Sequence, residues 1–284
     1  MTCDAGSANS IPREMRGLIV APMTKVIMRS FTAVMLLLSV AASAQAQTPP
    51  LWTIQLTHRE ERLAHERLRG ATDLSVLRRI GRGAVGVDVS WIDELSRHSV
   101  GVGAELYTPL WHSSEGWLRV FSAPRAWSAP DFLVAAELTQ HLRDGWHVSL
   151  SADDREYDQG RVNFLMAGTG WSSDKWFTRV RAGALITETK TMATGHVLVR
   201  RASPDRRRHV QITAGTGGDV FDFADPVGGT PLITGQSTTA AISVRYPATP
   251  SLAVNAGFGV GDYGSFGTRA HFEAGIIIFA GVHR

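Results

Sequence analysis

The chain has 284 residues, which is enough for one large domain or two small ones. Hydrophobic residues make up 44% and charged residues 19%, with 28 glycines, so the composition fits neither a disordered tail nor a helical membrane bundle. The formal net charge is +3, but basic residues are spread along the chain, which argues against nucleic acid as a partner. The single cysteine, Cys3, excludes a disulfide scaffold.

An export signal is predicted near the N-terminus. Residues 31–41 form an apolar run, which Lys25 and Arg29 precede, and small residues at 42–46 contain two Ala-x-Ala patterns. This order of a basic, an apolar and a small-residue region is typical of a secretory signal peptide. The run is shorter than the roughly 20 apolar residues that a membrane-spanning helix needs. An uncleaved N-terminal anchor is the alternative interpretation.

Three regions follow from this signal. We expect an over-extended start at residues 1–22, a cleaved signal peptide at 23–46, and a mature chain at 47–284. No later segment reaches about 18 uninterrupted apolar residues, so no helical membrane span is expected. The exported protein is then periplasmic, secreted or a β-barrel.

Short segments with a period of two dominate the mature chain. In residues 85–91, valines and Trp91 alternate with Gly86, Asp88 and Ser90. Because successive strand residues point to opposite faces, this alternation predicts strands with one apolar and one polar face. The same pattern recurs further along the chain, at 132–139, 176–182, 197–200, 252–261 and 269–280.

Turn signals separate these segments at the spacing of β-hairpins, and we expect about 14 strands (12–16) between residues 51 and 281. The longest loop is predicted at 217–236. The least strand-like region is 59–70, which the charge pattern assigns to a short helix or a charged loop.

Tryptophans fall mainly near the predicted strand ends. Aromatic rings favour the boundary between membrane and water, so this placement favours a membrane barrel over a soluble β-sandwich, in which they would pack in the core. These residues are Trp52, Trp91, Trp117, Trp146, Trp171 and Trp176.

The predicted fold class is all-β: a single antiparallel up-and-down transmembrane β-barrel. Only helices and closed barrels satisfy every backbone hydrogen bond inside a bilayer, and no helical span is present in the sequence. The polar face of each strand would then line the lumen. The lumen-facing charged candidates are Asp88, Glu105, Glu137, Arg179, Arg181, Arg245, Arg269 and Glu273.

The order of segments resembles the YaiO-type outer-membrane β-barrel family, most clearly over residues 131–281. The resemblance is carried by an apolar strand, a Gly-Trp opening and an Arg-x-Tyr strand end, which here are Phe132–Leu138, Gly145-Trp146 and Arg155–Tyr157. It implies an outer-membrane location, and the family supplies no catalytic residues. One departure is that Phe279 is followed by five residues, whereas such barrels often end on an aromatic residue that the assembly machinery reads.

Two clusters of side chains are candidates for chemistry. His147 and Ser149 form a His-x-Ser pair of the kind that a lipid hydrolase uses as base and nucleophile, but they lie opposite the apolar face of their strand. The acidic residues at 153–158 could bind Ca²⁺, although they lack the spacing of an EF-hand. Histidine spacing gives no zinc site. We therefore predict no catalytic residues, no cofactor and no metal.

The sequence predicts a non-enzymatic outer-membrane barrel with a structural or small-solute pore role. Its expected partners are outer-membrane lipid, lipopolysaccharide and the barrel-assembly machinery. The alternatives are a lipid-modifying barrel enzyme that uses His147 and Ser149, and a soluble periplasmic β-protein.

Overall fold

The computed structural model describes residues 50–281 apart from 64–65, 95–96, 125, 127–128, 159, 204–206, 222–232 and 265–266. The predicted signal peptide at 23–46 lies outside the described residues. Within them, no helix is long and apolar enough to cross a membrane.

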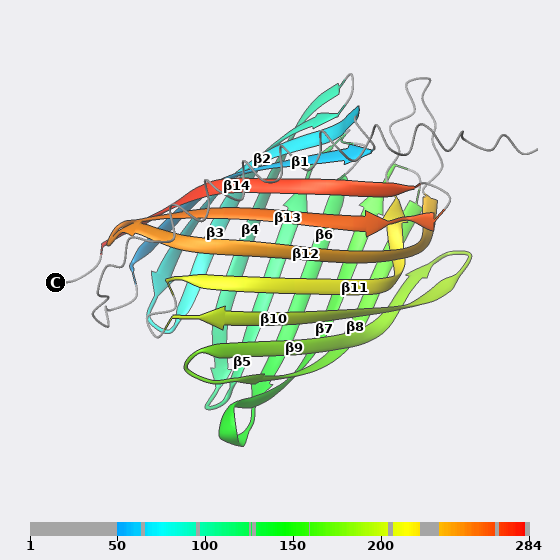
Figure 1. Cartoon of the computed structure of the whole chain (residues 1–284). Coiled ribbons are helices and arrows are strands. Elements are labelled where there is room, and N and C mark those ends of the chain that lie inside the picture. The colour runs from blue at the N-terminus through cyan, green and yellow to red at the C-terminus, as the bar shows by residue number, and fades with distance from the viewer. Residues whose placement is uncertain are drawn as a thin grey trace, which may run out of the picture. The chain divides into compact units, whose positions relative to one another are not determined.

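The described chain forms a closed barrel of 14 antiparallel strands (Figure 1). Each strand pairs with its neighbours in sequence, and the first pairs with the last, so the predicted up-and-down barrel of about 14 strands is confirmed. The strands are β1 Trp52–Leu63, β2 Glu66–Ile80, β3 Gly83–Glu94, β4 Arg97–Trp111, β5 Ser114–Ser122, β6 Phe132–His141, β7 Trp146–Tyr157, β8 Gly160–Ser172, β9 Trp176–Thr187, β10 Thr191–Ala202, β11 His209–Phe221, β12 Ile233–Thr249, β13 Leu252–Asp262 and β14 Thr268–Ala280.

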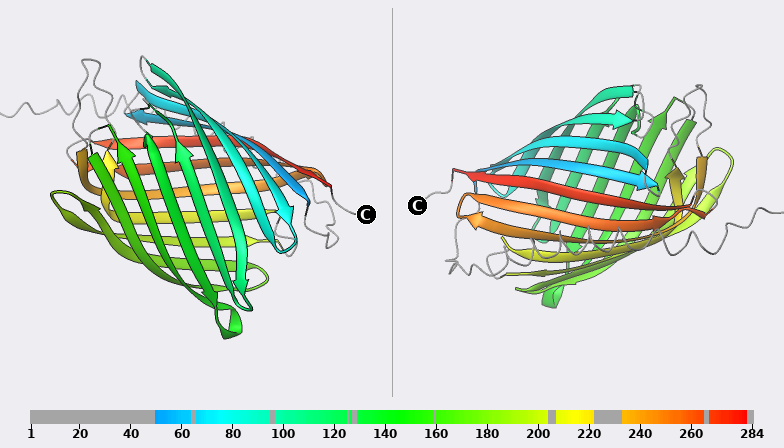
Figure 2. Two further views of the ribbon diagram at one scale, coloured as in Figure 1. Left: turned by 180° about the vertical axis from the view of Figure 1, so that it is seen from behind. Right: turned by 45° about the horizontal axis from the view of Figure 1, so that its top comes forward.

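The barrel closes at the seam between β1 and β14, which lie side by side in Figure 2. Their register runs without interruption from Trp52 opposite Ala280 to Leu63 opposite Arg269. Closure leaves no unpaired sheet edge, which is the condition for placing strands in lipid.

The alternation of side chains explains the two faces of the wall. In β3, Asp88 and Ser90 are buried, whereas Val87 and Trp91 are 54% and 46% exposed. The same outward apolar set continues in the other strands, for example at Leu150, Val180 and Ile212. An outer surface of exposed aliphatic side chains around a polar interior is the arrangement of a transmembrane barrel.

Aromatic residues mark the rims of this outer surface. Trp146 and Trp176 begin their strands and are 51% and 42% exposed. The guanidinium of Arg201 lies 5.7 Å from the Trp176 ring centroid. Trp117 departs from the prediction, because the register turns it inward, where its indole N–H donates to Glu105. Inward and outward residues alternate at every position, so a tryptophan near a strand end is not by itself a membrane-boundary residue.

The two ends of the barrel differ in their connections. The end at which β1 starts and β14 finishes, here called the terminal end, has 203–208 as its longest connection. The opposite, distal end carries the longer connections 123–131 and 222–232.

The region at 59–70 is not a helix or a charged loop, and that prediction is wrong. It forms the end of β1 and the start of β2, joined by a short connection. Strand pairing brings opposite charges into contact: Glu61 lies directly opposite Arg69 and bonds it at 2.6 Å, and Arg59 bonds the diagonal neighbour Asp73 at 2.6 Å. Because opposite charges meet across the two strands, a segment rich in charge is accommodated in a sheet.

The predicted loop at 217–236 is shorter in the structure. Strand β11 continues to Phe221 and β12 begins at Ile233, so both ends of that range are strand. The glycines Gly217 and Gly218 pair with Ser237 and Gln236 there.

Candidate functional site in the barrel lumen

All eight of the charged residues singled out in the sequence lie on the inward face of their strands. Residues that pair directly across two strands point to the same side of the sheet, so the strand register shows which residues share the inner face. Asp88 pairs with Gly103 on β4, and Glu105 pairs with Gly86 on β3 and with Arg119 on β5. The inward face therefore brings charges from distant parts of the sequence into one lumen.

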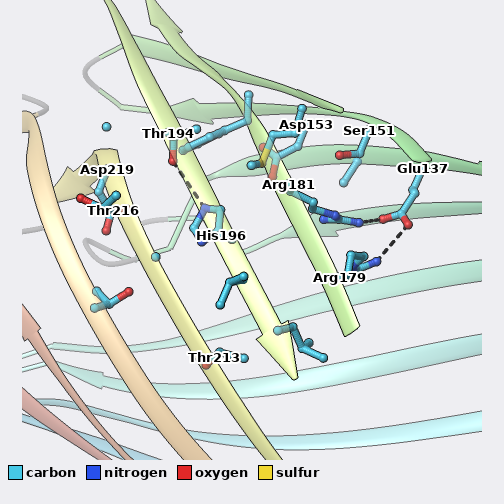
Figure 3. A pocket seen from close by; sticks show the side chains of 18 of the residues that line it. Glu137, Ser151, Asp153, Arg179, Arg181, Thr194, His196, Thr213, Thr216 and Asp219 are labelled. Atoms are coloured by element: carbon cyan, nitrogen blue, oxygen red, sulfur yellow. Dashed lines mark hydrogen bonds and ion pairs between the residues drawn. The ribbon is translucent and has the colours of Figure 1, made fainter. Parts of the chain in front are cut away.

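Glu137 is the meeting point of the central cluster. It lies on β6 and accepts hydrogen bonds from both Arg179, at 3.1 Å, and Arg181 of β9 (Figure 3). Strands β7 and β8 lie between these partners, so both arginine side chains reach across two strands. The Glu137 side chain is 14% exposed, and those of Arg179 and Arg181 are 27% and 20% exposed. Glu137 thus balances one of the two positive charges.

Small residues on the intervening strands make this reach possible. A Cβ atom at Gly168 on β8 would lie 2.8 Å from Cγ of Arg181 and 3.0 Å from Oγ of Ser149. A side chain at position 168 would therefore occupy the space that Arg181 now crosses. Glycine here provides the space over which the arginine lies flat against the wall.

The same arrangement recurs on the neighbouring part of the wall, strands β3 to β5. Asp88 on β3 accepts a hydrogen bond from Arg119 on β5 at 3.2 Å, over the β4 residue Gly103. A Cβ atom at Gly103 would lie 2.6 Å from Oδ1 of Asp88, and one at Gly86 would lie 2.8 Å from Cγ of Glu105. Charged side chains therefore fold along the wall over neighbouring glycines, which explains why glycine and charge share the polar face.

A cavity remains in the interior. Its volume is about 460 Å³, and its lining includes residues of β5 to β12, among them Trp117, Glu137, Arg181 and Thr213. Figure 3 shows Arg179 and Arg181 turned toward Glu137 at one side of this space. An interior lined by charged and hydroxyl side chains can be filled with water. Because the charged side chains lie along the wall, space for that water remains.

A second ion cluster ties the barrel seam at its distal end. Glu61 on β1 accepts from Arg69 on β2 at 2.6 Å and from Arg269 on β14 at 2.9 Å. The side chains of Arg269 and Glu61 are only 5% and 11% exposed. Arg269 also lies 4.6 Å from the Tyr263 ring centroid. This cluster joins the first, second and last strands, which gives it a structural role.

The remaining two predicted charges lie on β12 and β14. Glu273 accepts a hydrogen bond from Nδ2 of Asn255 at 2.8 Å. Arg245 is half-buried, and its buried Nε has no hydrogen-bond partner in the described part of the chain.

His147 and Ser149 are both buried and face the lumen, away from lipid. The His147 ring stacks on Phe177 at 5.3 Å between centroids, and its Nε2 has no hydrogen-bond partner within the described residues. A serine nucleophile needs a base in hydrogen-bond contact, and Nε2 does not provide that contact here. The geometry gives no support to the hydrolase alternative.

The acidic residues at 153–158 do not gather around one point. Asp153 faces the lumen and binds Arg155, whereas Asp154 faces outward and binds Arg161. Adjacent strand residues point to opposite faces, so these carboxylates are separated by the wall. Over residues 50–281, outside the gaps given above, no group of three or more metal-ligating side chains is present.

Several charged residues of the lumen were missed by the sequence reasoning. Arg119 lies inward beside the predicted Glu105, and Glu61 belongs to the region that is not expected to be strand. The alternation at 197–200 does place Arg200 on the polar face, but Arg200 is not among the candidates. The alternation of residues in 114–122 is a signal that could have placed Arg119 on the inner face.

No protein family matches this chain, and no curated protein matches it in sequence. Among solved structures, it is similar to the CymD monoaromatic hydrocarbon channel, with 11% identity and a TM-score of 0.53 over 84% of this chain and 90% of that one. It is also similar to a bacterial polysaccharide outer membrane secretin, with 8% identity and a TM-score of 0.54 over 82% and 99% of the two chains. At these identities the likeness concerns fold alone. The chain therefore has the fold of a transmembrane β-barrel of the outer-membrane type.

Proposed function

We propose that this protein is a passive pore for small solutes in the bacterial outer membrane, without enzymatic activity. The observation that carries the proposal is the polar cavity of about 460 Å³ inside a closed barrel whose charged side chains lie against the wall. Barrels wider than the eight-stranded type have room for water in the lumen, and inward charges then remain hydrated.

We also propose that the protein is located in the outer membrane and that the signal peptide at 23–46 directs its export. By resemblance, we propose that it belongs to the YaiO-type family. The exposed aliphatic surface supports contact with outer-membrane lipid, and lipopolysaccharide and the barrel-assembly machinery are the proposed partners. A soluble periplasmic protein is disfavoured, because exposed side chains such as Val87, Leu150 and Val180 would then meet water.

Planar-bilayer recordings test the pore. The full mature chain, refolded in detergent, is added to a lipid bilayer in KCl, and stepwise current increases of uniform size are expected. Refolded and boiled samples are compared by gel mobility, since a closed barrel migrates differently until it is boiled. A correctly folded barrel that gives no steps would show that the lumen is plugged, and the pore proposal would then be wrong.

A further inference from the structure

Three cationic or imidazole side chains of the lumen lie together on β10, β11 and β12, and none of the three forms an ion pair within the described residues. In the register, His209 pairs directly with Arg245, and Gln211 pairs directly with Arg200. All four residues face inward, and they lie near the terminal end of the barrel. We call Arg200, His209 and Arg245 the basic triplet.

The hydrogen bonds of the triplet leave donors unused. Arg200 directs Nε and Nη2 to the single amide oxygen of Gln211, at 2.8 and 2.6 Å, which leaves its Nη1 without a partner among the described residues. The guanidinium of Arg245 makes no hydrogen bond there, and its Nε is fully covered. A guanidinium carries five N–H donors, and a buried donor without an acceptor is unfavourable. Arg245 therefore has a buried donor without an acceptor, and Arg200 has one amino group that is not used within the described residues.

The neighbouring carboxylates are engaged by other residues. Glu137 accepts from Arg179 and Arg181, and Glu273 accepts from Asn255. Neither forms an ion pair with Arg200 or Arg245. Arg200 instead lies over the Phe177 ring, 5.7 Å from its centroid. Four arginines, Arg179, Arg181, Arg200 and Arg245, face inward from β9, β10 and β12, and Asp219 is the one carboxylate that the described residues of β9 to β12 place in the cavity lining. Even with Glu137 of β6 and Glu273 of β14 counted beside them, the arginines outnumber these carboxylates.

The triplet lies just beyond the cavity, on the side of the terminal end. Leu198 on β10 and Thr213 on β11 line the cavity. The next inward residues in the direction of the terminal end are Arg200 and Gln211, by the alternation of each strand. A solute that moves along this wall would pass from Arg179 to Arg200 and then to Arg245.

We propose that Arg200 and Arg245, with His209 between them, form an oxyanion-binding site that makes the pore anion-selective. The ligand class is a small carboxylate or phosphate, whose paired oxygens match the fork of donors on a guanidinium. The proposal rests on the pore proposed above for its transport consequence, but binding to the site does not require an open passage.

Reversal potentials in a KCl gradient and block of the chloride current by inorganic phosphate test the site. Wild type is expected to prefer chloride over potassium and to be blocked by phosphate. The double variant Arg200→Gln and Arg245→Gln is expected to lose most of the preference and to weaken phosphate block by about tenfold, which corresponds to about 1.4 kcal/mol. Acetate in place of phosphate shows whether the site takes carboxylates as well.

Two further variants separate charge from geometry. Arg245→Lys keeps the positive charge but loses the planar fork, so chloride preference is retained while phosphate block weakens. Arg161→Gln removes a positive charge from the outer face of β8, where the side chain is 62% exposed, and leaves both measurements unchanged. Equal effects of Arg161→Gln and of the double variant would overturn the proposal, because the effect would then follow net charge alone.

Failure of this site and failure of the pore are distinguishable. A conducting barrel without chloride preference and without phosphate block contradicts the site and leaves the pore standing. A folded barrel that does not conduct contradicts the pore, and titration calorimetry of phosphate into the detergent-solubilised protein then decides the site. Heat release that disappears in the double variant supports it, and no heat in wild type overturns it.

Discussion

Glu137 and Arg181 form an ion pair across two intervening strands, with Gly168 beneath the arginine side chain. This pair lies along the wall of the cavity. The ion pair joins β6 to β9 and holds the Glu137 and Arg181 side chains against the wall. The charge of the interior and its free width therefore both depend on this ion pair.

Replacement of Glu137 tests the energetic weight of this cluster. Glu137→Gln leaves Arg179 and Arg181 without their carboxylate in a partly buried setting, and we expect a loss of about 2–3 kcal/mol in unfolding free energy. Tryptophan fluorescence during guanidinium unfolding in lipid vesicles measures it. Glu115→Gln is the control, because that lumen carboxylate is 61% exposed and pairs only with His141 among the described contacts. Equal losses in both variants would contradict the role given to Glu137.

Gly168 provides a test of the space under Arg181. Gly168→Ala places a Cβ 2.8 Å from Cγ of Arg181 and 2.9 Å from the backbone oxygen of Val180, so we expect destabilisation of about 1–3 kcal/mol and an altered single-channel conductance. Gly195→Ala is a matched control on β10, since its Cβ would meet only the Arg181 oxygen at 3.5 Å. If both variants behave like wild type, the glycine beneath the arginine is not needed.

Leu150 and Ser151 are adjacent on β7 and test which face meets lipid. Leu150 is 54% exposed on the outer surface, whereas Ser151 lines the cavity. Leu150→Arg should reduce unfolding free energy in vesicles by about 2–4 kcal/mol, because a charge enters the hydrocarbon. Ser151→Arg should change conductance with a smaller effect on stability. The reverse order of stabilities would show that the faces are assigned the wrong way round.

The seam between β1 and β14 depends on Arg269. This buried side chain binds Glu61, 208 residues away in sequence, and we expect Arg269→Gln to lower the unfolding free energy by about 3 kcal/mol. Gel mobility as a function of heating temperature reports the loss as earlier opening. Arg62→Gln, which removes a 47% exposed partner of Glu60, should cost less than about 1 kcal/mol.

We expect that His147 and Ser149 do not catalyse lipid hydrolysis. Purified protein incubated with phospholipid and lipid A should leave both intact, as judged by mass spectrometry. A product formed by wild type and absent from Ser149→Ala would contradict this expectation and restore the hydrolase interpretation.

The sequence predicts strands well where one face is uniformly apolar. In β13 and β14 the alternation of valine, isoleucine and phenylalanine with glycine and charge identifies both the strands and their faces. In 59–70 both faces carry charge, so periodicity of hydrophobicity disappears, although strand pairing neutralises those charges.

The contacts inside the lumen were not predictable in the same way. Alternation places Glu137, Arg179 and Arg181 on the inner face, but their pairing depends on the register of three successive hairpins. A shift of two residues in one hairpin would preserve every face and separate the partners. Periodicity therefore gives orientation, whereas side-chain partners require the three-dimensional arrangement.

The pairing of β1 with β14 has a consequence for biogenesis. Strand β1 is synthesised before all the others, but its partner at the seam, β14, is synthesised last. One hydrogen-bonding edge of β1 therefore has no partner until β14 is available. Throughout that interval the unfinished sheet exposes backbone groups that would otherwise recruit foreign strands. The unpaired edge of β1 therefore has to be protected in the cell until the barrel closes.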